Sequence, residues 1–186
     1  MRKQVYGTFT PPCLCDIVQD NIDAGFYDAE FVELYTKEEI NELQSFIDHS
    51  RDEYLTYAAM EQFRGKYLVQ NRATGNIYET PQVAYMMIAA TLFAKYPAET
   101  RMSYVKAYYD AISTFKISLP TPVMAGVRTP QRQFSSCVLI ETGDSLDSIN
   151  ATSSAIVKYV SQKAGIGIGA GSIRALGSPI RSGDTT

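Results

Sequence analysis

Residues 135–141 read Ser-Ser-Cys-Val-Leu-Ile-Glu, and residues 165–171 read Gly-Ile-Gly-Ile-Gly-Ala-Gly. The first stretch is a short β-type run bounded by turn residues, which predicts a buried strand. Between the two stretches, Gly143-Asp-Ser145 precedes a helical pattern that runs through Val160, and Gly165 follows its end. A strand, a helix and a glycine-rich strand in succession predict an α/β unit.

The glycine-rich stretch does not fit a dinucleotide-binding fingerprint. That fingerprint needs a glycine three residues after a Gly-x-Gly pair, and the two candidate positions hold Ala170 and Ser172. No Walker motif is present in the sequence either. We therefore interpret residues 165–171 as a strand where backbones approach closely, followed by a loop over residues 172–183.

The loop over residues 172–183 contains two arginines, Arg174 and Arg181, as its only charged residues. They are either solvated or form a bidentate clamp on a phosphate. The wider charge pattern agrees with an anionic ligand in this part of the chain. Residues 1–60 hold 12 acidic and 4 basic residues, whereas residues 61–186 hold 8 acidic and 13 basic residues. We therefore expect any anionic ligand on the second part.

The residues before position 116 are mostly helical in pattern. Helical spacing marks residues 14–24, 81–96 and 99–114, and capping boxes at Thr36–Glu39 and Ser50–Glu53 predict two more helix starts. Residues 66–79 resemble a small hairpin. The pattern over 81–96 is apolar nearly all round, which predicts the buried helix. We therefore expect a helical domain over residues 1–115 and an α/β region over residues 116–186.

The composition excludes several classes of protein. The 186 residues carry a formal net charge of −3, which is unlike a generic nucleic-acid binder. No apolar run resembles a membrane span or a signal peptide, so we expect a cytoplasmic protein. The single histidine, His49, excludes a Ser-His-Asp triad and a multi-histidine metal site, and we interpret it as a solvated loop residue. The odd cysteine count favours reduced thiols, with Cys13 and Cys15 structural and no metal site.

Several longer motifs of the sequence are specific enough to indicate a family. They are Gly65-Lys-Tyr-Leu-Val-Gln-Asn71, Tyr109-Asp-Ala-Ile-Ser-Thr-Phe-Lys116, Leu119-Pro-Thr-Pro122, Gly126-Val-Arg-Thr-Pro130, Arg132-Gln-Phe-Ser-Ser-Cys-Val-Leu-Ile-Glu141, Gly143-Asp-Ser-Leu-Asp-Ser-Ile-Asn-Ala-Thr-Ser-Ser154 and Ile173-Arg-Ala-Leu-Gly-Ser-Pro-Ile-Arg181. Together they resemble the large, catalytic subunit of class I ribonucleoside-diphosphate reductase. The resemblance runs from about Tyr6 to about Gly183.

The resemblance implies a fold and a reaction. The fold is a helical N-terminal domain followed by the first strands and helix of a ten-stranded α/β barrel. The reaction is thiyl-radical reduction of ribonucleoside diphosphates to deoxyribonucleoside diphosphates for DNA synthesis, with oxidation of a dithiol. The family's ATP cone would precede these residues and its radical cysteine would follow them, so we expect neither here. The chain alone is then inactive.

The resemblance also assigns roles residue by residue. Cys137 matches one of the two thiols that become a disulfide after turnover. Thr121 and Ser136 match positions that contact the substrate. Residues matching the allosteric specificity site at the dimer interface are Asp144, Ser145, Leu146, Arg174 and Arg181. Gly169 and Ser172 replace larger polar or basic residues that are expected in many relatives.

The implied partners follow from the same resemblance. They are a C-terminal piece of the large subunit, a small β subunit with a di-metal radical centre, a second copy across the effector helix, and a thioredoxin- or glutaredoxin-type reductant. The chain itself would bind no cofactor, only a dNTP or ATP effector and nucleoside diphosphate substrates. An alternative interpretation is a non-catalytic remnant or regulatory nucleotide-binding module. Neither nucleic acid nor membrane is an expected partner.

Overall fold

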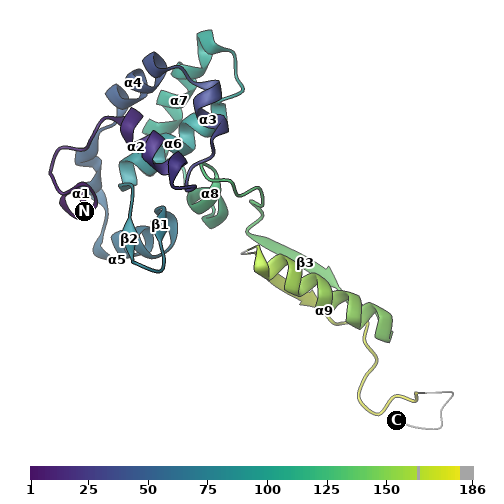
Figure 1. Cartoon of the computed structure of the whole chain (residues 1–186). Helices are drawn as coiled ribbons and strands as arrows, with labels where there is room; N and C mark the ends of the chain where they lie inside the picture. The colour runs from purple at the N-terminus through teal and green to yellow at the C-terminus, as the bar shows by residue number, and fades with distance from the viewer. Residues whose placement is uncertain (163, 181–186) are drawn as a thin grey trace. The chain divides into compact units, whose positions relative to one another are not determined.

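The computed structural model describes residues 1–162 and 164–180. The chain divides into two compact units, residues 1–134 (unit 1) and residues 135–186 (unit 2), which are described separately (Figure 1). The division falls 19 residues after the expected boundary at 115/116. The reason is a short helix, α8 (Thr121–Gly126), which sequence analysis did not predict and which packs on the helices of unit 1. Among the described residues, no helix has the length and apolar character needed to span a membrane.

Unit 1 is a helical unit with one small hairpin. Its elements besides α8 are α1 (Arg2–Tyr6), α2 (Leu14–Asp23), α3 (Glu30–Leu34), α4 (Lys37–Phe46), η1 (His49–Tyr54), α5 (Tyr57–Gln62), η2 (Phe63–Tyr67), β1 (Gln70–Asn71), β2 (Asn76–Ile77), α6 (Pro81–Phe93) and α7 (Ala98–Ser113). Strands β1 and β2 pair antiparallel, as the hairpin pattern predicts.

Helix α6 forms the centre of unit 1. Its residues from Pro81 to Ala90 are all buried, which confirms the prediction of a buried helix. Helix α7 packs along it, and the apolar side chains of Val105 and Ile112 are buried in the shared core. Tyr109 is buried there too, and its hydroxyl donates to Gln82 Oε1 at 2.8 Å and accepts from the Asp48 N–H at 2.9 Å. Core packing and these two hydrogen bonds therefore account for a tyrosine at position 109.

The two predicted capping boxes had different outcomes. At the start of α4, the Thr36 hydroxyl accepts from the Glu39 N–H and the Glu39 carboxylate accepts from the Thr36 N–H, as predicted. The prediction at Ser50 was wrong. Ser50 lies inside the 3₁₀ helix η1, whose cap is the Asp48 carboxylate, and α5 begins later with Thr56 as its cap. The sequence near Ser50 contains two other side chains that can accept from the first N–H groups of a helix, and these two, Asp48 and Thr56, form the caps.

A fully buried ion pair ties the hairpin to α8. Arg128 donates its Nε–H to Glu79 Oε2 at 2.8 Å, and both side chains are completely buried. Glu79 also accepts from the Tyr27 hydroxyl at 2.5 Å and from the Val69 N–H at 2.7 Å. Arg128 Nη2 also donates to Glu79 Oε1, and Nη1 and Nη2 donate to the carbonyls of Met124 and Tyr67, at 2.8 Å each. Both charges are thus satisfied by several partners, as buried charges require.

Unit 2 contains the strand–helix–strand arrangement that the sequence predicts. Strand β3 (Cys137–Glu141) pairs parallel with β4 (Gly165–Gly169), and helix α9 (Leu146–Ser161) connects them. The register places Cys137 opposite Gly165 and Glu141 opposite Gly169. The fold class, a helical domain followed by an α/β element, is therefore confirmed.

Candidate functional site

The two faces of the β3–β4 sheet differ sharply. On one face, Thr142 after the end of β3 shares a hydrogen bond of 2.9 Å with Thr152 of α9, and both residues are buried. Residues alternate between faces along a strand. Val138 and Ile140 therefore lie on the α9 face, while Cys137, Leu139 and Glu141 lie on the opposite face.

The face that holds Cys137 is open because β4 presents glycines there. A Cβ built on Gly165 would lie 3.2 Å from Cys137 Sγ, and one on Gly167 would lie 2.6 Å from Leu139 Cδ2. A Cβ on Gly169 would meet the Glu141 carboxylate. The β3 side chains thus lie across the β4 backbone. Cys137 is exposed and has a free thiol, whereas the sequence predicted a buried strand.

The N-terminus of α9 brings Asp144 and Arg174 together. Arg174 donates from Nε to Asp144 Oδ2 at 2.8 Å and from its backbone N–H to Asp144 Oδ1 at 3.2 Å. Its Nη1 donates to the Pro179 carbonyl at 3.0 Å. A guanidinium has five N–H donors, and two of them have these partners within the part of the chain that the structure describes. The loop arginine is therefore held in place at the surface.

A local hydrogen-bond network caps the N-terminus of α9. The Ser145 hydroxyl accepts from the Ser148 N–H at 3.1 Å, and the Ser148 hydroxyl accepts from the Gly143 N–H at 2.8 Å. The side chain of Leu146 is 85% exposed. Because the first N–H groups of a helix have no intrahelical acceptor, this end of α9 favours an anion beside Arg174.

The structure brings together only some of the predicted site residues. Asp144, Ser145, Leu146 and Arg174 meet at the start of α9, and Ser136 lies beside Cys137, with its carbonyl accepting from the Gly165 N–H at 2.9 Å. Thr121 is an exposed residue of unit 1, in the first turn of α8. Arg181 lies outside the described residues.

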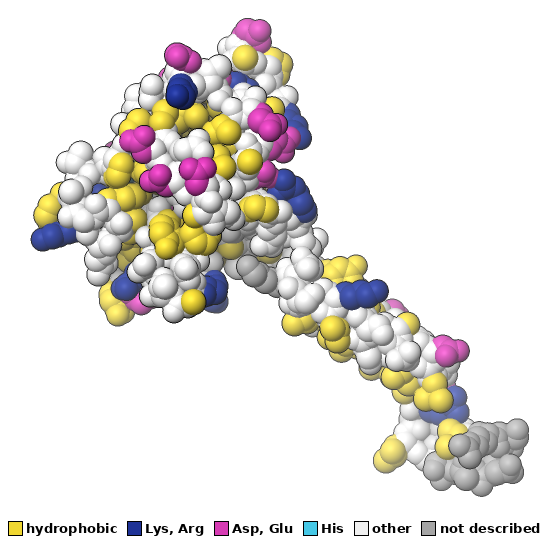
Figure 2. Space-filling model, viewed as in Figure 1, with side chains coloured by type: hydrophobic (Ala, Val, Ile, Leu, Met, Phe, Trp, Pro, Cys, Tyr) yellow, Lys and Arg dark blue, Asp and Glu magenta, His cyan; other side chains and the backbone are white. Residues whose placement is uncertain are grey.

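The surface of α9 carries exposed apolar side chains at helical spacing. They are Leu146, Ile149, Val157 and Val160. Figure 2 shows hydrophobic side chains along the surface of unit 2. An apolar helix stripe without cover is typical of an interface.

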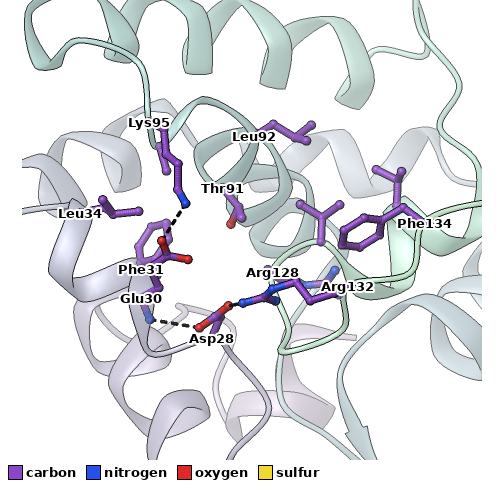
Figure 3. Close-up of a pocket in the computed structure, with 13 residues that line it drawn as sticks. Asp28, Glu30, Phe31, Leu34, Thr91, Leu92, Lys95, Arg128, Arg132 and Phe134 are labelled. Atoms are coloured by element: carbon purple, nitrogen blue, oxygen red, sulfur yellow. Dashed lines mark hydrogen bonds and ion pairs between the residues drawn. The ribbon is translucent and has the colours of Figure 1, made fainter. Parts of the chain in front are cut away.

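A cavity of unit 1 lies between α3, α6 and α8, and the sequence did not predict it. It has a volume of about 440 Å³, and Phe31, Leu92 and Phe134 are among its apolar lining residues (Figure 3). Two ion pairs line the cavity, one between Lys95 and Glu30 and one between Arg132 and Asp28. No sequence signal was available because Asp28 and Arg132 are 104 positions apart.

The interpretation of His49 as a solvated residue was wrong. The residue is half-buried, and its buried Nδ1 has no hydrogen-bond partner among the described residues. Burial lowers the pKa of His49, and the nearby positive charge of Arg2 lowers it further. The residues that the structure describes include no group of three or more His, Cys, Asp or Glu that could hold a metal ion.

Comparisons with known proteins match both units. The family model "Ribonucleotide reductase, all-alpha domain" matches residues 53–132, and the model "Ribonucleotide reductase, barrel domain" matches residues 135–186. Ribonucleoside-diphosphate reductase 1 subunit alpha of Escherichia coli (strain K12) is 66% identical over 184 residues, which is 99% of this chain and 24% of that protein.

Two further relatives match the same part of the chain. The ribonucleoside-diphosphate reductase subunit alpha of Haemophilus influenzae (strain ATCC 51907 / DSM 11121 / KW20 / Rd) is 64% identical, and that of Enterobacteria phage T4 is 51% identical. Each alignment covers 99% of this chain and 24% of the relative. The chain thus spans about a quarter of the length of the curated relatives it matches.

Proposed function

Because the chain belongs to the ribonucleotide reductase large-subunit family, we propose that it forms the helical domain and the opening strand–helix–strand unit of the barrel in a ribonucleoside-diphosphate reductase. The complete enzyme reduces ribonucleoside diphosphates to deoxyribonucleoside diphosphates. This chain supplies one reducing thiol, part of the substrate contacts and part of the effector site. A polypeptide containing the radical cysteine and a radical-generating β subunit supply the rest.

The observation that carries this proposal is the position of Cys137. Helices cover the outside of an α/β barrel, so the helix-free face of its sheet points inward. Cys137 lies on the helix-free face of β3, where its thiol is exposed, and Gly165 opposite it has no side chain that would crowd the sulfur. Its thiol can therefore meet a substrate and a second thiol inside a completed barrel. Thr121 and Ser136 are proposed to contact the same substrate.

The chemistry assigned to Cys137 balances as a dithiol oxidation. Two thiols give up two protons and two electrons and become a disulfide, while the ribose 2′-hydroxyl leaves as water and hydrogen takes its place. The second thiol is supplied by the remaining polypeptide. A small dithiol protein then regenerates both thiols by exchange, which requires that a sulfur be accessible.

The start of α9 is proposed as the half of the effector site that this chain supplies. Arg174 would bind the effector phosphates beside the helix N-terminus, and Asp144 both orients Arg174 and accepts from a sugar hydroxyl. Ser145 and Leu146 complete the contact, and Arg181 is assigned to it as well. The exposed apolar stripe on α9 is proposed to pair with a second copy, which would complete the site.

Reconstitution tests the reducing role. The chain is mixed with a polypeptide containing the remaining barrel, the β subunit and a dithiol reductant, and deoxynucleotide formation is followed. We expect Cys137→Ser to abolish multiple turnover and to leave effector binding unchanged. Cys15→Ser is the matched control and should turn over like the unmodified chain. Normal steady-state turnover by Cys137→Ser would favour a purely nucleotide-binding module.

Effector titration tests the second role in the same assembled enzyme. Arg174→Ala should weaken dNTP binding by about 1–3 kcal/mol, because a charge-assisted hydrogen bond to phosphate is lost. Substrate preference should then respond less to added dNTP. Arg72→Ala, in the hairpin loop of unit 1, is the matched control. Unchanged affinity in Arg174→Ala would show that this arginine only pairs with Asp144 and does not bind the effector.

A further inference from the structure

Two thiols meet at the start of α2, outside every site assigned above. Cys13 is the residue before the helix and has extended backbone angles, φ −55° and ψ 139°, whereas Cys15 lies in the first turn. Cys13 Sγ lies 3.8 Å from Asn41 Oδ1, and Cys15 Sγ lies 3.4 Å from the same oxygen. Both thiols are therefore gathered around one amide oxygen of α4.

The fold holds this arrangement in place. Leu14, between the two cysteines, is buried in the core, and its N–H donates to Gln44 Oε1 of α4 at 2.7 Å. Cys15 Sγ is also 3.9 Å from the Lys37 carbonyl. Both cysteines are half-buried and free, so their sulfurs are held by the protein and can still be reached from solvent.

The number and kind of donors select the ligand. A structural zinc site needs four ligands, and calcium or magnesium needs several oxygens. Among the described residues, no group of three or more Cys, His, Asp or Glu could hold a metal ion, so the pair has no third side chain placed as a ligand. Thiolates favour Cu(I) and zinc among the biological metals, and two thiolates fall short of the four ligands that zinc needs. The pair therefore suits the soft monovalent cation Cu(I).

We propose that Cys13 and Cys15 form a two-thiolate binding site for Cu(I). Two S–Cu bonds form and two S–H bonds break, with both protons released to solvent and no change in oxidation state. The complex formed from one monovalent cation and two thiolates carries a single negative charge. That charge lies at the N-terminus of α2, a helix of 10 residues, where the helix dipole stabilises an anion.

The metal-free Cys15 thiol is expected to be protonated. Burial raises the pKa of Cys15, and the neighbouring Cys13 raises it further, because two adjacent thiolates repel each other. A cation that binds both sulfurs removes this repulsion. Binding therefore displaces protons, as for other thiolate metal sites.

Competition with a chromophoric Cu(I) chelator tests the site. The full chain, reduced and under anaerobic conditions, should remove one Cu(I) per chain from the chelator and show thiolate-to-copper absorption in the ultraviolet. Cys13→Ser and Cys15→Ser should each lose this competition. Serine is a favoured residue at the position before a helix, so Cys13→Ser should keep its fold, which far-ultraviolet circular dichroism checks.

The third cysteine provides the matched control. Cys137→Ser should bind Cu(I) as the unmodified chain does, and Zn(II) should not displace Cu(I) from either protein. The proposal is overturned if the unmodified chain does not compete, if Cys13→Ser competes equally well, or if Cys137→Ser loses binding. None of these outcomes depends on reductase activity, so the site is tested separately from the proposed function.

Discussion

In unit 1, the ion pair between Glu79 and Arg128 is completely buried, whereas in unit 2 the ion pair between Asp144 and Arg174 lies at the surface. The buried pair contacts a tyrosine hydroxyl, a backbone N–H and two carbonyls of the same unit. The exposed pair joins a helix N-terminus to a loop. A charge whose partners are all internal maintains the fold, while a charge held at the surface is available to a ligand.

The apolar side chains differ between the units in the same way. Unit 1 buries a continuous set of them around α6, and its core extends from α2 to α8. In unit 2, Leu139 of β3 and Leu146 of α9 are each 85% exposed. Unit 1 therefore has the core of an independently folded domain, whereas unit 2 leaves apolar side chains of both its strand and its helix exposed.

The largest effect should come from removing the charge of Glu79. Glu79→Gln keeps the shape of the side chain but leaves the Arg128 guanidinium buried without its counter-ion. We expect a loss of about 3–5 kcal/mol in the free energy of unfolding of unit 1. Urea denaturation followed by circular dichroism measures it, and hydrogen exchange assigns the loss to unit 1.

The surface pair at the cavity of unit 1 is the matched control for Glu79→Gln. Asp28→Asn removes the counter-ion of Arg132; the Arg132 side chain is 62% exposed and the Asp28 side chain is 23% exposed, against 0% for both members of the buried pair. Water replaces the lost contact, so the loss should be about 1 kcal/mol or less. Equal losses in the two variants would contradict the distinction between buried and exposed pairs.

The contrast also explains how much of the fold could be predicted from sequence. Local signals were sufficient for the Thr36 capping box, for the buried helix α6 and for the strand–helix–strand order of unit 2. Helix α8 was missed because Pro120 and Pro122 indicate an ending, although proline is well tolerated in the first turn of a helix. Ser50 was misassigned because Asp48 offered a competing cap.

Contacts between distant positions could not be predicted from local sequence. Glu79 and Arg128 are 49 positions apart, and Asp144 and Arg174 are 30 positions apart. Neither pair has a spacing rule that selects it from the other charged residues. The residues proposed as the effector site at α9 come from motifs that resemble a family. Sequence analysis gave Cys13 and Cys15 a structural role, and it could not predict that both sulfurs lie near Asn41, because Asn41 is on another helix.

A smaller effect is expected in the pH dependence of stability. It should differ between the two units, because the single histidine is in unit 1. Burial lowers the pKa of His49 in the folded state, while the unfolded chain keeps a value of about 6.5. Below that value the unfolded chain binds more protons than the folded chain. The stability of unit 1 should therefore fall as the pH decreases through the window between about 6.5 and the lowered pKa of the folded state.

Urea midpoints at several pH values between about 7.5 and about 5 measure this effect. His49→Gln removes the titrating group and should flatten the part of the pH dependence that arises from it. Hydrogen exchange in α9 should show the same pH response in both proteins, because unit 2 contains no histidine. An identical slope for unit 1 in both proteins would mean that His49 titrates as it does in the unfolded chain.

The smallest effect is expected for a valine on the outer surface of α9. Val157 is 69% exposed, and Val105, in α7, is completely buried, so Val→Ala at the two positions removes the same atoms from opposite environments. Val105→Ala should cost about 2 kcal/mol through lost burial and a residual cavity. Val157→Ala should change the free energy of unfolding by about 0.5 kcal/mol or less, partly because alanine favours helix.

Urea denaturation at low protein concentration measures both changes in the free energy of unfolding. A loss at Val157 as large as that at Val105 would show that this face of α9 is covered in the folded chain, and a dependence of the midpoint on protein concentration would identify a second copy as the cover.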